Sequence, residues 1–104
     1  MKLKPVKADG EIYGYSFFCP GCEHSHVFFV KGSKTWSFNN DFEAPTFSPS
    51  LLNTCPDHPD SRQRRCHLNL IAGILVFAGD CSHPFAGKQV VLTDHDPLPR
   101  DHSA

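Results

Sequence analysis

The sequence shows almost no helix signal. No stretch of twelve residues places apolar side chains at the i, i+3, i+4 and i+7 spacing of an amphipathic helix. Nine prolines and seven glycines interrupt the chain at short intervals, which favours short strands joined by turns. The chain also contains nine phenylalanines, and phenylalanine is enriched in strands. The sequence therefore predicts an all-β fold.

Long apolar runs and an excess of one charge are also missing. No run of eighteen apolar residues is present, so we expect no membrane-spanning helix. Residues 1–10 contain lysines but no apolar segment typical of a secretory signal. The formal net charge of -1 gives no general attraction to nucleic acid or to an anionic membrane. We therefore expect a cytoplasmic protein.

Familiar catalytic motifs are absent as well. The chain contains no G-x-S-x-G, no H-E-x-x-H and no phosphate-binding loop. The sequence therefore points to no known enzyme class, and the interpretation leans away from an enzyme.

The pattern of apolar runs and turns predicts one domain over residues 1–104, with flexible ends at 1–10 and 94–104. Pro49 cannot donate a ladder hydrogen bond, so its segment is expected at a sheet edge or a bulge. The expected fold is a small antiparallel β-sandwich or barrel-like domain of about six to eight strands, with a zinc-knuckle hairpin. Strands are expected at 11–18, 26–30, 35–39, 46–54 and 88–93, with a hairpin over 66–77.

Five cysteines are unusual for a short chain in a reducing compartment, where metal binding is more common than disulfides. Cys19 and Cys22 flank a Pro-Gly turn, which lets two sulfurs converge on one ion. A strand is expected after this turn, whereas redox C-x-x-C pairs usually precede a helix. Cysteine and histidine cluster four times, as Cys19 with Cys22, Cys55 with His58, Cys66 with His67, and Cys81 with His83.

Zinc (Zn2+) usually takes two pairs of ligands from two turns. The predicted ligands are Cys19, Cys22, Cys81 and His83, with Cys66 or His67 as the substitute. Four protein ligands would form a closed structural site, whereas three and a water would form a catalytic one.

Two other pairs of residues are weaker ligand candidates. Cys55 and His58 lie in a polar, proline-rich loop. His24 and His26 follow the C-x-x-C turn and could replace a cysteine or hydrogen-bond to a ligand.

A polar cluster is expected near the second hairpin. His67 and Asp80 are the candidate catalytic residues, because a carboxylate beside a histidine can orient it or act as a base. Thr46, Ser48 and Ser50 alternate along one segment, so their hydroxyls share a face. The simpler interpretation is that Asp80 caps a turn and the hydroxyls satisfy an edge strand.

Five motifs in a fixed order, from Phe17 to Leu92, resemble a family of short proteins of unknown function found in phages and prophages. Its members often carry the label "ammonia monooxygenase". The resemblance implies a phage or prophage setting in a host cell and a small β domain that holds a metal, but no reaction. In some relatives a serine stands at the position of Cys81, which favours Cys66 or His67 as a ligand. The motifs are FFCPGC, WSFN, PTFSPSLL, CHLNLIAGILVF and DCSHPFAGKQVVL.

Three functional hypotheses follow. The first is a zinc-binding phage or prophage accessory protein that acts by protein–protein interaction, modulating a host enzyme or defence system through a host or phage partner. The second is a small zinc-dependent hydrolase, with His67, Asp80 and His83 around a zinc-bound water. The third is a zinc-ribbon-like nucleic-acid-binding module that uses the arginines at 62, 64 and 65.

Overall fold

A computed structural model describes residues 2–94, which form two antiparallel sheets. The first sheet, in chain order, consists of β1 (Lys4–Ala8), β2 (Glu11–Cys19) and β3 (His24–Phe29). The second sheet, also in chain order, consists of β4 (Ser37–Phe38), β5 (Phe47–Thr54), β6 (Arg65–Ile71), β7 (Ile74–Phe77) and β8 (Gln89–Val91). The described residues contain one short 3-10 helix, η1 (Ser61–Gln63), and no α-helix. The predicted antiparallel all-β fold is confirmed, and no helix in residues 2–94 could span a membrane.

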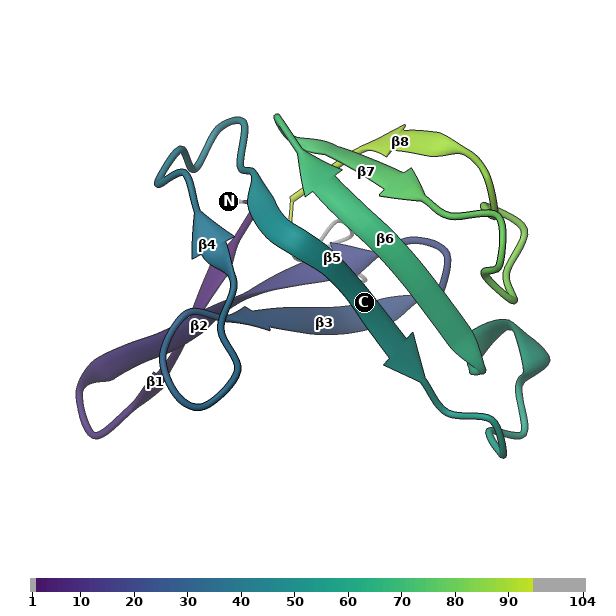
Figure 1. Cartoon of the computed structure of the whole chain (residues 1–104), viewed down its shortest axis with the longest axis horizontal. Coiled ribbons are helices and arrows are strands. Elements are labelled where there is room, and N and C mark those ends of the chain that lie inside the picture. Colours follow the sequence, from purple (N-terminus) through teal and green to yellow (C-terminus); the bar gives the residue numbers. More distant parts are fainter. Residues whose placement is uncertain (1, 95–104) are drawn as a thin grey trace, which may run out of the picture.

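The two sheets face each other across an aromatic core. Figure 1 shows β5 and β6 of the second sheet crossing over β2 and β3 of the first. The rings of Phe28 on β3 and Phe47 on β5 stack with their centroids 4.3 Å apart. Both side chains are fully buried, so the phenylalanine-rich composition serves to join the sheets.

Alternation along β6 decides which residues reach the core. Cys66, Leu68 and Leu70 are buried, while the residues between them are more exposed. Successive side chains of a strand point to opposite faces. Cys66 therefore faces the interior, and His67 faces the outer surface of the second sheet.

The N-terminal segment differs from the expectation of a flexible end over residues 1–10. Lys4–Ala8 form β1, which pairs with β2 from Lys4 opposite Ser16 to Ala8 opposite Glu11. The connecting Asp9 and Gly10 both have positive φ, at 52° and 77°, as tight hairpin turns require. The Asp-Gly pair was thus the sequence signal for this hairpin. Of the expected C-terminal flexible end, residues 95–104 lie outside the described residues.

Strand β5 is irregular around Pro49. Phe47 lies opposite Leu70 and Leu51 lies opposite Leu68, so four steps along β5 face two steps along β6. This register shift agrees with the bulge, one of the two positions expected for Pro49. A bulge re-aims the side chains next to it, and here it places Ser50 beside β6.

Candidate catalytic and metal sites

Ser50, His67 and Asp80 form a continuous hydrogen-bonded chain. Ser50 Oγ lies 3.3 Å from His67 Nε2, and His67 Nδ1 lies 3.2 Å from Asp80 Oδ1. The three residues come from β5, β6 and the turn after β7. A hydroxyl, an imidazole and a carboxylate in this order have the connectivity of a serine hydrolase triad. Distances slightly above 3.2 Å are usual before substrate binds.

Arg65 supports the carboxylate end of this chain. Its Nε and Nη2 groups donate to Asp80 Oδ2 at 2.9 and 2.7 Å. These bonds, with the weaker one from His67, hold the pKa of the Asp80 carboxyl below its ordinary value. The carboxylate therefore stays ionised and accepts the Nδ1 proton of His67, which leaves the Nε2 lone pair facing Ser50.

The triad lies on the surface, where a large substrate can reach it. The side chains of His67 and Asp80 are 31% and 43% exposed. A cleft of about 440 Å³ adjoins Ser50 and is lined by Lys34, Thr35, Trp36, Pro49, Ser50 and Leu52. Mostly apolar walls with a few polar groups are typical of binding clefts.

A second cluster lies inside the molecule and consists of Cys19, Cys22, His26 and Cys66, which we call the thiol site. One ligand atom from each residue lies within 4.8 Å of all the others, and all four residues are buried. The Sγ atoms of Cys19 and Cys66 are 3.8 Å apart. The site joins the end of β2, the C-x-x-C turn, β3 and β6. The described part of the chain thus contains a cluster able to bind a metal ion.

Hydrogen bonds among the thiols favour one negative charge in this site. Bonds from Cys22 and Cys66 hold the pKa of Cys19 well below its ordinary value. The same bond to Cys19 raises the pKa of Cys22 to about 12. Because thiolates are the form that binds metal, a bound cation would favour deprotonation of all three sulfurs.

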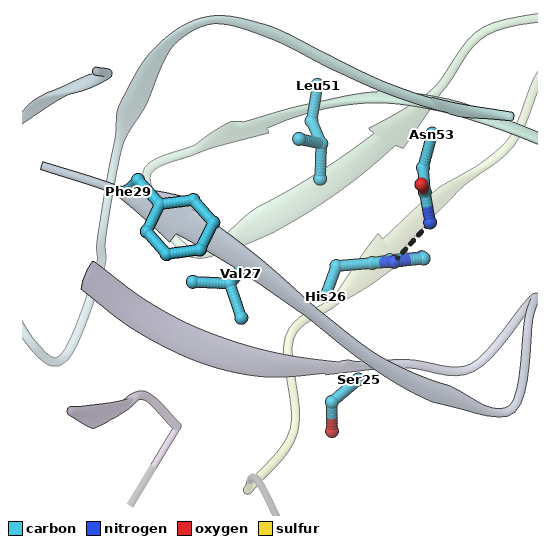
Figure 2. Close-up of a pocket in the computed structure, with 6 residues that line it drawn as sticks. All are labelled: Ser25, His26, Val27, Phe29, Leu51 and Asn53. Atoms are coloured by element: carbon cyan, nitrogen blue, oxygen red, sulfur yellow. Dashed lines mark hydrogen bonds between the residues drawn. The ribbon is translucent and has the colours of Figure 1, made fainter. Parts of the chain in front are cut away.

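The two buried histidines near the cysteines differ in whether Nε2 can present a lone pair to a metal. Within the described residues, Nε2 of both His26 and His83 is buried without a hydrogen-bond partner. His26 Nδ1 lies 3.0 Å from the side-chain amide of Asn53, as Figure 2 shows. Turning this amide over presents its oxygen to an Nδ1 proton, which leaves the Nε2 lone pair free for a metal.

His83 has no such choice. Its Nδ1 accepts the backbone N–H of Phe85 at 3.2 Å, and a backbone donor cannot be exchanged for an acceptor. Its Nε2 must therefore carry the proton in the neutral ring. Burial also lowers the pKa of His83. His26 is consequently the better fourth ligand.

The predicted ligands fall into two neighbouring groups that share Cys66. Cys19 and Cys22 lie with Cys66 and His26, whereas Cys81 and His83 lie with Cys66 in a second group within 4.8 Å. Cys81 also contacts the backbone of His67, with its Sγ 3.2 Å from the carbonyl oxygen. Cys55 and His58 belong to neither group among the described residues.

The structure places the candidate catalytic pair, His67 and Asp80, in direct contact. Ser50 was considered only as one of several hydroxyls on a strand face, and its partner became visible only with the β5–β6 pairing. His83 does not accompany this pair. Its ring packs in the interior against Phe77, with the centroids 4.9 Å apart.

The arginine loop is occupied by partners within the chain. Arg62 donates to the carboxylates of Glu23 and Asp60. Arg64 donates to the backbone oxygen of His58 at 2.8 Å. With Arg65 on Asp80, the basic run offers little support for the nucleic-acid hypothesis.

Gly21, in the C-x-x-C turn, allows the His83 ring to pack against this turn. A Cβ atom at Gly21 would lie 2.4 Å from His83 Cε1, and the ring is buried. We expect Gly21→Ala to lower the free energy of unfolding by about 1–3 kcal/mol through overpacking. Urea denaturation measures this change.

The matched control is Gly79→Ala, because nothing lies within 4 Å of a Cβ at Gly79. It should change the stability by less than about 0.5 kcal/mol. Equal stability of the Gly21 and Gly79 variants would show that the His83 ring does not pack there.

A family model matches residues 2–78, and its description is "bacterial ubiquitination-like system serine protease (BubE)". The match includes Ser50 and His67 and ends shortly before Asp80. No curated protein and no solved structure matches this chain.

Proposed function

This chain belongs to the BubE family, and we propose that it is a serine protease of a bacterial ubiquitination-like system. The observation that carries the proposal is the hydrogen-bonded chain from Ser50 through His67 to Asp80. The family description supports the reaction class, and the geometry supports Ser50 as nucleophile, His67 as base and Asp80 as the orienting carboxylate. The partner expected from the sequence is a host or phage protein. In this proposal that partner is a polypeptide substrate.

In the proposed reaction, Ser50 Oγ attacks the carbonyl carbon of the scissile bond. His67 Nε2 takes the hydroxyl proton and then gives it to the leaving amine as the carbon–nitrogen bond breaks. Water, deprotonated by the same nitrogen, then hydrolyses the Ser50 acyl ester. Asp80 keeps the Nδ1 proton of His67 in place throughout, and Arg65 keeps Asp80 ionised and oriented.

A fluorophosphonate probe tests the nucleophile directly, because it phosphonylates an activated serine and releases fluoride. We expect labelling of one residue, located at Ser50 by peptide mass spectrometry. His67→Ala should slow the labelling by about 10³-fold or more, since the base is lost.

Ser48→Ala is the matched control, because Ser48 lies on the same strand and no described hydrogen bond joins it to His67. It should be labelled like the wild type. Labelling that survives Ser50→Ala would contradict the proposed nucleophile.

For the thiol site we propose a zinc ion bound by Cys19, Cys22, Cys66 and His26. Three thiolates and one imidazole are a common ligand set of structural zinc. Three observations support this set, namely the distances within 4.8 Å, the burial of all four residues, and the unpartnered Nε2 of His26. A site with four protein ligands is closed, so the ion would stabilise the fold and leave catalysis to the triad.

We also propose a cytoplasmic setting. The resemblance to phage and prophage proteins suggests that the protease acts in the cytoplasm of a host cell. A reducing cytoplasm would keep the cysteines of the thiol site available for zinc.

A further inference from the structure

Among the described residues, no strand pairs with one edge of β5 next to Ser50. β4 pairs with Phe47 and Ser48, and within residues 2–94 no strand pairs with Leu52 or Thr54 on the side away from β6. Figure 1 shows this half of β5 extending past β4. Exposed peptide groups on such an edge are a template for a further strand.

The alternating hydrogen bonds between β5 and β6 show which peptide groups of β5 face this open edge. The backbone N–H of Cys55 donates to the oxygen of Arg64 at 2.8 Å. In an antiparallel pair every second residue bonds to the partner strand, so Leu51 and Asn53 also point their peptide groups toward β6. The N–H and C=O groups of Leu52 and Thr54 therefore point to the open edge.

Two cavities lie on opposite faces of this stretch. The cleft beside Ser50 takes Pro49, Ser50 and Leu52 from β5. A second pocket of about 300 Å³ takes Leu51 and Asn53 from β5 and is closed by Ser25, His26, Val27 and Phe29 of β3. In Figure 2 Asn53 points from β5 toward His26. From Ser50 to Asn53 the lining residues thus alternate between the two cavities.

This arrangement matches a bound chain in extended conformation. The side chains of an added strand alternate between the two faces with the same two-residue period. Main-chain hydrogen bonds supply affinity in such complexes, and side-chain pockets supply specificity. The open edge ends at Ser50, whose backbone oxygen already accepts the indole N–H of Trp36 at 3.3 Å.

Resting on the proposed function, we infer that the substrate binds as an added β-strand along the open edge of β5. Its main chain bonds to Leu52 and Thr54, and its side chains enter the two cavities in turn. The scissile carbonyl then lies at the end of the strand, beside Ser50 Oγ. The substrate class is an extended, unpaired polypeptide segment, and small esters or folded strands would be poor substrates.

Boronic acids test this inference, because Ser50 Oγ adds to boron while His67 takes the hydroxyl proton. The probes are methylboronic acid and the peptide acetyl-Ala-Ala-boroalanine. We expect the peptide to slow hydrogen exchange at the amides of Leu52 and Thr54 by about tenfold, the value of one or two added hydrogen bonds. Methylboronic acid should leave both rates unchanged. Equal exchange with both probes would overturn the inference.

A pair of variants isolates the edge hydrogen bond. Leu52→Pro removes the N–H that faces the edge and no bond to β6, whereas Leu52→Ala removes the side chain and keeps the N–H. The affinity gain of the peptide over methylboronic acid should be about fivefold smaller in the proline variant than in the alanine variant. Equal gains would show that the edge is not used. If the proline variant does not fold, the exchange rates of the wild type still decide.

The two probes also distinguish a failure of the added-strand inference from a failure of the proposed serine protease function. If methylboronic acid does not bind the wild type, the proposed serine nucleophile fails. If it binds and the peptide binds no better, only the added strand fails.

Discussion

Ser50→Ala is expected to lower kcat/KM for a peptide substrate by about 10⁴-fold or more, the scale seen when a triad nucleophile is removed. The reason is that Ser50 supplies the hydroxyl that lies 3.3 Å from His67 Nε2. The fold should survive, because Ser50 lies on the outer face of the second sheet. Initial rates and thermal melts of the same preparations measure both effects.

The triad residues should also act as one unit. His67→Ala should reduce the rate by a similar factor, and combining it with Ser50→Ala should add almost nothing. Ser48→Ala is the control and should keep the wild-type rate. A Ser50→Ala protein that retains a tenth of the activity would require a different nucleophile.

Cys66→Ser is expected to remove the metal and lower the free energy of unfolding by at least about 3 kcal/mol, because the binding energy of a structural zinc is folding energy. For a domain of this size the melting temperature should fall by about 12 °C or more. Native mass spectrometry should find one zinc ion in the wild type and none in the variant. A chelator should also lower the melting temperature of the wild type, as the Cys66→Ser substitution does.

Cys55→Ser is the matched control, since Cys55 is exposed and belongs to neither cysteine group. It should keep the metal and lie within about 0.5 kcal/mol of the wild type. A Cys66→Ser protein that keeps one zinc ion and the wild-type melting temperature would exclude Cys66 as a ligand.

Two histidine variants then distinguish the two ligand sets. His26→Ala should lose the metal. His83→Ala should keep it, although stability falls because a buried ring is removed. The opposite pattern would restore the set predicted from sequence, in which His83 is a ligand.

Local patterns predicted most of the fold. Short runs of aromatic and β-branched residues between turns predicted β2, β3, β5 and the β6–β7 hairpin, because burial of alternate side chains leaves a period of two in the sequence. The segment of β1 has weak strand propensity, and its pairing depends on the turn at Asp9 and Gly10. A turn signal can therefore matter more than the composition of the strand it positions.

The sites were less predictable because they join distant segments. Ser50 and His67 are 17 residues apart, and His67 and Asp80 are 13 apart, and the bulge at Pro49 sets their register. Cys19 and Cys22 were visible because their spacing is local. The choice between His26 and His83 depends on whether the neighbour of Nδ1 can accept a hydrogen bond, as an amide side chain can and a backbone N–H cannot. No sequence pattern records that contact.

The alternation of side chains along β6 limits where insertions and deletions in the sequence can be tolerated. Cys66 faces the thiol site and His67 faces Ser50, so one peptide unit connects the two centres. A slip of β6 by one residue against β5 would invert every side chain of the strand. The imidazole would then enter the interior, and a sulfur would face the substrate. Insertions are therefore compatible with the loop before β6, residues 55–64, only if the register of β6 against β5 stays unchanged.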